Sequence, residues 1–216
     1  MTGAEVTDSA LAKTGSFLAR AVRMELRIYD SIGRAITRRP AIDRGGSGFT
    51  YHRPVLTILI IFIALSALEI PILDLIVHRW PVVRIIVLIV GIWGLTWMIG
   101  LLCAYFMRPH VVAPGGIRIR EGLETEIFLS WDDIASVGRV RQVDPPKSPR
   151  FSDTEDGRLL SLRMQDETNI EIRLERPTSV RLAGRPPKGG IHDVEAVRLW
   201  TDDPTGYLAA VDRHMP

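Results

Sequence analysis

The stretches VLTILIIFIALSALEIPILDLIV (55–77) and VVRIIVLIVGIWGLTWMIGLLCAYFM (82–107) decide the fold of this chain. A helix needs roughly 20 apolar residues to cross a bilayer core about 30 Å thick. Each stretch is long enough, and only residues 78–81 separate them. Because so short a connection forces the two helices to run antiparallel, the sequence predicts a transmembrane hairpin over residues 54–107.

The rest of the 216-residue chain is divided unequally between the two flanks of the hairpin. Of the two, only residues 108–216 are long enough to form a domain with its own core. A single cysteine, Cys103, allows no internal disulfide, which suits a reducing compartment. The first 15 residues lack the apolar region of a signal peptide, so we expect the first apolar stretch to be retained.

Positive charge near the spans predicts their orientation. Loops rich in Arg and Lys stay in the cytoplasm. Two arginines, Arg79 and Arg84, stand at the tip of the hairpin, whereas the flanks carry more. The flanking arginines are Arg34, Arg38, Arg39, Arg44 and Arg53 before the hairpin and Arg108, Arg118 and Arg120 after it. We therefore expect a multi-pass protein of the plasma membrane with both termini in the cytoplasm.

The N-terminal flank predicts a disordered segment, a helix and a linker. Residues 1–15 are polar and small, and we expect them to be disordered. Residues 16–38 combine an apolar stripe with a basic stripe at helical spacing. The basic stripe consists of Arg20, Arg23, Arg27, Arg34 and Arg38. Such a helix lies in the interface of an anionic leaflet or packs its apolar stripe on protein, and Glu25 within the apolar sector weakens the first reading.

Residues 39–53 contain Pro40 and the sequence GGSG at 45–48, which end a helix and predict a linker into the membrane. A phosphate-binding loop is excluded because no Lys-Ser/Thr pair follows the glycines.

Three ionisable residues, Glu69, Asp74 and Arg84, fall within the apolar stretches. Such residues are costly at membrane depth and raise a functional hypothesis. In an antiparallel hairpin Asp74 falls roughly opposite Arg84, so we expect an ion pair near the tip. An alternative is that these residues serve a transport or channel assembly of which the chain is a small accessory subunit.

After residue 111 the pattern changes to apolar–polar alternation, which predicts a bent antiparallel sheet with one buried face. Segments 158–164 and 169–174 are predicted to form a hairpin around residues 165–168. Asp203 and Pro204 then begin a C-terminal helix. Loops 144–157 and 183–193 are rich in Pro and Gly, and we expect both to be mobile. The other predicted strands are 117–120, 125–131, 134–143, 179–182 and 194–200.

The sequences Ile117-Arg-Ile-Arg120 and Leu129-Ser-Trp131-Asp-Asp-Ile134-Ala-Ser-Val137 resemble the opening of bacterial PH-like domains attached to membrane spans. In that family a strand runs into the pattern W-x-x-I-x-x-V. The resemblance covers about half of the chain. It implies an α+β fold over residues 108–216, in which a bent sheet or partly open barrel is capped by the C-terminal helix, and it implies no catalytic residues. A five-stranded OB barrel without the terminal helix is the alternative fold.

No pattern of catalytic or metal-binding residues is evident, and we expect neither enzyme activity nor a cofactor. The five histidines are scattered, with no ligand spacing to one another or to Cys103. Asp132 and Asp133 predict a turn between strands. Arg118 and Arg120 alternate with apolar residues, which predicts a solvated face or one that meets phospholipid headgroups or an acidic partner.

The expected function is therefore that of a membrane-anchored interaction module at the inner leaflet. Its expected partners are the lipid bilayer and a protein partner or a second copy of the chain, and not nucleic acid. A membrane-associated enzyme with an unrecognised site is the third reading.

Overall fold

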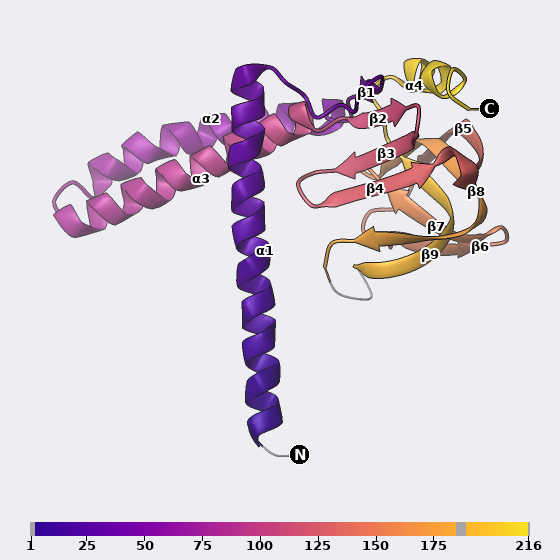
Figure 1. Ribbon diagram of the computed structural model, residues 1–216. Helices are drawn as coiled ribbons and strands as arrows, with labels where there is room; N and C mark the ends of the chain where they lie inside the picture. The colour runs from indigo at the N-terminus through magenta and orange to yellow at the C-terminus, as the bar shows by residue number, and fades with distance from the viewer. Residues whose placement is uncertain (1–2, 185–188, 216) are drawn as a thin grey trace.

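The computed structural model describes residues 3–184 and 189–215, with side chains from residue 19 onward. Within these residues the chain forms four α-helices and nine strands, and is an α+β protein. Two long helices project away from the strands, and a third long helix lies across them (Figure 1).

Helix α1 (Gly3–Thr37) is longer than predicted. It includes residues 3–15, for which we expected disorder, so that prediction is wrong over this range. The segment AEVTDSALAKT is rich in alanine and other good helix formers, which accounts for the difference. The helix ends at Thr37, and the next residue, Arg38, has a left-handed φ of 51°. The backbone N–H groups of Arg38 and Arg39 then donate to the Ala35 and Arg34 carbonyls, a Schellman motif.

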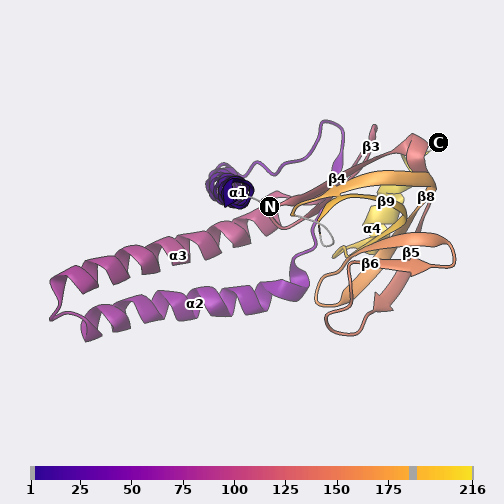
Figure 2. The same cartoon turned by 90° about the horizontal axis from the view of Figure 1, so that it is seen from below.

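Helices α2 (Arg53–Ile76) and α3 (Pro81–Met107) lie side by side and run in opposite directions (Figure 2). Both are long and apolar enough to cross a membrane. Their apolar side chains are not buried by the rest of the chain, because α2 has no buried residue and α3 has only Gly100 and Ala104. The core helix of a soluble protein would be covered on at least one face.

The first sheet has the order β1-β2-β3-β4, with every pair antiparallel. Its strands are β1 (Ser47–Phe49), β2 (His110–Ala113), β3 (Gly116–Glu121) and β4 (Thr125–Ser130). Strand β1 corrects our prediction that residues 39–53 are only a linker. Glycine permits this pairing, because a Cβ at Gly48 would lie 2.7 Å from Ile42 Cδ1 and one at Gly46 would lie 2.8 Å from Val111 Cγ1.

The second sheet has the order β5-β8-β9-β7-β6. Its strands are β5 (Ile134–Val143), β6 (Phe151–Thr154), β7 (Gly157–Leu162), β8 (Glu167–Leu182) and β9 (Gly190–Leu199). Strands β7 and β9 are parallel, which corrects the prediction of a purely antiparallel sheet.

The predicted hairpin between segments 158–164 and 169–174 is also wrong. Their connection closes only the Met164–Glu167 bridge, and β8 then pairs with β5 and β9. The continuous burial of residues 159–162 suits a strand between two neighbours, which an alternating pattern does not reveal.

The loop 144–157 is not the mobile segment that we expected. Its second half contains β6, which pairs with β7. Its first half is held by Arg163, which donates to the Ser148 and Pro149 carbonyls and forms an ion pair with Asp144 at 2.5 Å. In the other predicted mobile loop, β9 begins at Gly190, and residues 185–188 lie outside the described residues.

Both sheets contribute to one hydrophobic core, and α4 (Pro204–Val211) packs against it. Tyr207, Ala210 and Val211 of α4 are buried there, and the Asp203 carboxylate caps the helix by accepting from Gly206 N at 2.9 Å. The predicted C-terminal helix is therefore confirmed. Its presence argues against the alternative OB barrel, which has no terminal helix. A short 3₁₀ turn (Trp131–Asp133) forms at the predicted turn.

Candidate functional site at the junction of helices and sheets

Helix α1 crosses α3 near the end of α3 that joins the sheets (Figures 1 and 2). At the crossing Ile28 is buried and packs against Ala104 and Gly100. A Cβ at Gly100 would overlap Ile28 Cγ2, so the glycine allows the two helices to approach closely. Residues 100 and 104 lie roughly 5–10 Å from the end of α3 at 1.5 Å per residue.

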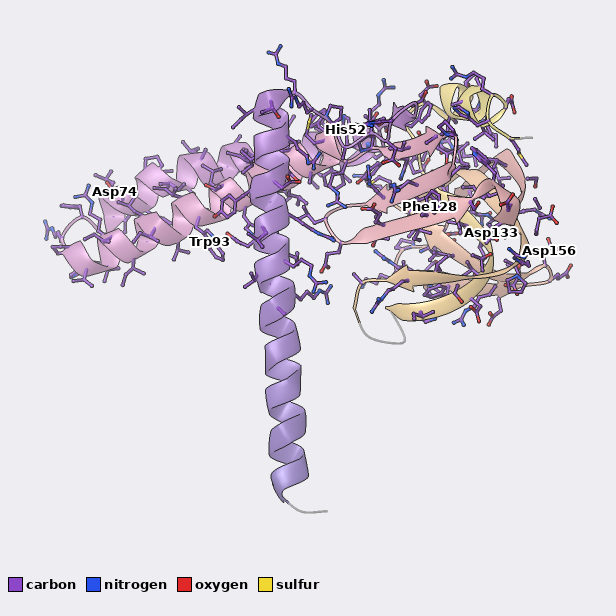
Figure 3. All side chains as sticks on the ribbon, viewed as in Figure 1. His52, Asp74, Trp93, Phe128, Asp133 and Asp156 are labelled. Carbon is purple, nitrogen blue, oxygen red and sulfur yellow. The ribbon has the colours of Figure 1, made fainter. Side chains whose placement is uncertain are left out.

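The carboxylate of Glu25 joins α1 to α3. It accepts hydrogen bonds from Trp93 Nε1 and Trp97 Nε1, each at 2.9 Å (Trp93 is labelled in Figure 3). These bonds lower the pKa of Glu25. They explain why an acidic residue interrupts the apolar sector of α1, and they show that the side of α1 that carries Glu25 and Ile28 packs on α3. In the sequence, the two tryptophans four residues apart were the signal that could have indicated a hydrogen-bonding partner on α3.

Two of the predicted arginines of α1 contact the turn between β3 and β4. Arg20 forms a bidentate pair with Glu124 at 2.6 and 2.7 Å, which lowers the pKa of Glu124. Arg27 Nη1 donates to the Leu123 carbonyl. The basic side of α1 therefore faces the sheets at these two positions. Of the other three, Arg34 pairs with Asp30 one turn away, and Arg23 and Arg38 are exposed.

Arg118 and Arg120 do not form the open face that their alternation predicted. Arg118 pairs with Asp43 and Glu126, each at 2.9 Å. Arg120 is only 6% exposed and donates to the Ala41 carbonyl. The segment before β1 covers both side chains, so the prediction of a lipid or partner contact is wrong for Arg120. The sequence gives no signal for this cover, because residues 41 and 120 are far apart along the chain.

The N-terminus of α2 is capped from the other end of the chain. The Asp202 carboxylate accepts from His52 N at 3.0 Å and from Arg53 N at 3.2 Å. The indole of Trp200 also donates to it at 3.2 Å, and Asp202 N donates to Thr50 O at 2.8 Å. A carboxylate stabilises the unpaired N–H groups and the positive end of the helix dipole there.

His110 lies at the centre of the junction in its neutral form. Its Nδ1 accepts from Arg120 N at 3.1 Å, so Nε2 carries the proton and donates to Trp200 O at 3.0 Å. The ring stacks on Tyr51, with 4.5 Å between centroids. Burial lowers the pKa of His110 to about 4. His110 therefore fastens β2 to the end of β9 and does not act as a metal ligand.

A groove of about 950 Å³ opens between α1, α3, the β3–β4 turn and the loop 147–151. Met24, Leu101 and Trp97 give it an apolar wall. Arg150 lines it opposite Glu121, with 3.0 Å between Nη2 and Oε2, and burial raises the pKa of Glu121. Among the residues that the structure describes, the cations that line the groove are Arg20, Lys147, Arg150 and Arg158, against the carboxylates Glu121 and Glu124.

The ionisable residues of the long helices lie at the far end. Asp74 and Arg84 form the predicted ion pair across the tip, with N–O distances of 2.5 and 2.9 Å (Asp74 is labelled in Figure 3). Glu69 is exposed on α2 and does not join this pair. The tip therefore contains one neutralised ion pair, whereas the junction contains a groove and several hydrogen-bond and ion-pair networks.

Within residues 3–184 and 189–215, no group of three His, Cys, Asp or Glu side chains is placed to hold a metal ion. In comparisons with known proteins, no family model, curated protein or solved structure matches this chain. The function is therefore inferred from the geometry of the junction.

Proposed function

We propose that α2 and α3 cross the plasma membrane as a hairpin with both termini in the cytoplasm. The two sheets then form a non-catalytic, PH-like interaction module held against the inner leaflet. The observation that carries this proposal is the orientation of α1, which has an exposed apolar stripe on the side away from the sheets.

The apolar stripe of α1 consists of Val22, Leu26, Tyr29 and Ile36, of which Leu26 is 64% and Ile36 is 78% exposed. Arg20 and Arg27, which face the sheets, lie roughly 150° around the helix from this stripe at about 100° per residue. The long side chains of Glu25, Trp93 and Trp97 extend the contact further along α3. The closest packing of the two helices, at Gly100 and Ala104, is about 5–10 Å from the end of α3. Amphipathic helices insert to this depth when they lie in a membrane interface. With α2 and α3 spanning the bilayer, α1 thus lies flat at the inner interface with its stripe in lipid.

The large exposed apolar surface of α2 and α3 supports the same placement. A surface of this kind marks a site of membrane or protein contact. The PH-like assignment is supported by two packed sheets and a C-terminal helix that contacts the core. The parallel pair of β7 and β9 and the added strand β1 depart from the bent antiparallel sheet that we expected.

Topology can be tested by labelling single cysteines in cells that express the chain. Cys103→Ser removes the native thiol, and Arg79→Cys and Lys147→Cys then place one thiol at the tip and one beside the sheets. We expect a membrane-impermeant maleimide to label residue 79 in intact cells and residue 147 only after the membrane is opened. The protein should also stay in the pellet after alkaline carbonate extraction. Labelling of residue 147 in intact cells, or release by carbonate, would contradict the proposal.

A further inference from the structure

We propose that the groove between α1, α3 and the loop 147–151 binds one anionic phospholipid of the inner leaflet. Its phosphate would lie on Lys147 and Arg158, and its acyl chains would follow Met24 and Leu101. This inference rests on the proposed function, because it requires α1 to lie at the membrane interface.

The first argument is the chemistry of the groove. One side is built from Met24, Trp97 and Leu101, which belong to helices placed at lipid depth. The other side is polar, and among the described residues the groove as a whole is lined by two more cations than carboxylates. A phospholipid has the same two-part character, with apolar chains joined to an anionic headgroup. A free anion would use only the polar side.

The second argument is which cations remain available. Arg20 is held by Glu124 at 2.6 Å, and Arg150 is held by Glu121 at 3.0 Å. Arg158 lies over the Phe151 ring at 5.0 Å and is 4.0 Å from the exposed Asp153 carboxylate. Lys147 is exposed at the rim. Lys147 and Arg158 are therefore the cations that an incoming phosphate meets first.

The third argument is that Lys147 is held in an unfavourable backbone conformation. Its φ is 65°, a left-handed value that costs a residue other than glycine of order 1 kcal/mol. The next residues are fixed by Arg163 through the Ser148 and Pro149 carbonyls. Strain of this kind persists where the surrounding structure fixes it, and it is frequent at ligand sites. The loop thus fixes the backbone from which the Lys147 side chain extends.

The experiment measures lipid binding to the purified full-length protein in detergent by native mass spectrometry. Phosphatidylglycerol and phosphatidylcholine with identical acyl chains are the probes. The test variant is Lys147→Glu/Arg158→Glu, and the matched control is Arg139→Glu/Arg141→Glu on strand β5, which makes the same change of charge away from the groove. We expect the unsubstituted protein to bind one phosphatidylglycerol molecule tightly. The affinity should fall at least about tenfold in the test variant and stay unchanged in the control.

Two further measurements identify the source of the phosphate. Met24→Gln should also weaken the binding of phosphatidylglycerol, and inorganic phosphate should not displace the bound lipid. Displacement by phosphate together with normal binding by Met24→Gln would overturn the proposal in favour of a simple anion site. Equal binding of the two lipids, or an equal loss of phosphatidylglycerol binding in the control variant, would also overturn it.

The carbonate extraction of the same variants separates this inference from the proposed function. If Lys147→Glu/Arg158→Glu remains in the membrane pellet while lipid binding is unchanged, the groove proposal is wrong and the anchoring proposal stands. If the unsubstituted protein is itself extracted, the anchoring proposal fails first.

Discussion

The two ends of the long helices differ in how they are closed. At the tip α2 and α3 are joined by one pair, Asp74 and Arg84, whose side chains are both partly exposed. At the base Asp202 caps α2, and its side chain is only 2% exposed. Glu25 and Arg20 add contacts from α1 to α3 and to the β3–β4 turn. The tip only needs to be closed, whereas the base fixes the direction of the sheets relative to the helices.

This comparison implies that the sheets are not tethered by a flexible linker. The segment between α1 and α2 forms β1, and the residues that follow β9 hold the start of α2. The helices and the sheets are therefore connected as one unit at the base. Substitutions at the base should accordingly have larger effects on stability than substitutions at the tip.

The largest effect is expected for Asp202→Ala. The change removes the acceptor for His52 N, Arg53 N and the Trp200 indole, and it leaves the part-buried His52 N and Trp200 donors without this partner. The cost should be about 2–3 kcal/mol of unfolding free energy. Thermal unfolding in detergent, followed by circular dichroism, measures it as a lower Tm. Asp202→Asn keeps one acceptor oxygen and should lose less; an unchanged Tm for Asp202→Ala would show that the cap is unimportant.

A somewhat smaller effect is expected from acidification, through His110. Its pKa is about 4 in the folded protein and near 6.5 when unfolded. Between these values the unfolded chain binds more protons, so stability is full above pH 6.5 and falls as the pH is lowered toward 4. At pH 5 the loss should be about 2 kcal/mol. The pKa of His52 is lowered by burial in the same direction, which adds to the slope.

The pH effect is measured as the difference in Tm between pH 7 and pH 5. His110→Gln should lower the Tm at pH 7 but reduce this difference. His78→Gln at the tip is the matched control and should leave it unchanged. A full pH dependence in His110→Gln would show that another group is responsible.

The features that were predictable from the sequence are local ones. The lengths of the apolar stretches predicted both long helices. The spacing across the four-residue connection predicted the ion pair between Asp74 and Arg84. The Asp203-Pro204 pair predicted the start of α4. Glu25 shows the limit of this approach. The sequence shows its place in the apolar sector, but its partners lie on another helix, 68 and 72 residues away.

The features that could not be predicted depend on residues far apart along the chain. Asp202 caps a helix that begins about 150 residues earlier. The parallel pairing of β7 with β9 depends on which strand occupies the neighbouring position, and local alternation does not contain that information. The groove has the same origin, because α1, α3 and the loop 147–151 meet only after folding.

The smallest effect is expected at the tip, for Asp74→Asn and Arg84→Gln. The pair is partly exposed, and in the proposed membrane placement the long Arg84 side chain can reach the membrane surface when its partner is lost. The shift in Tm should be well below that of Asp202→Ala, and the exchanged pair Asp74→Arg/Arg84→Asp should restore the original value. Glu69→Ala, outside the pair, should have no effect.

The same three variants test whether the tip serves a transport or channel assembly. If the ionisable residues carried ions or protons, neutralising any one of them would abolish function in cells while the Tm stayed nearly constant. We expect function to persist in all three, because Asp74 and Arg84 neutralise each other at 2.5 Å and Glu69 stands apart from them. Loss of cellular function in Asp74→Asn with normal amounts of folded protein in the membrane would reverse the comparison and move the functional site from the base to the tip.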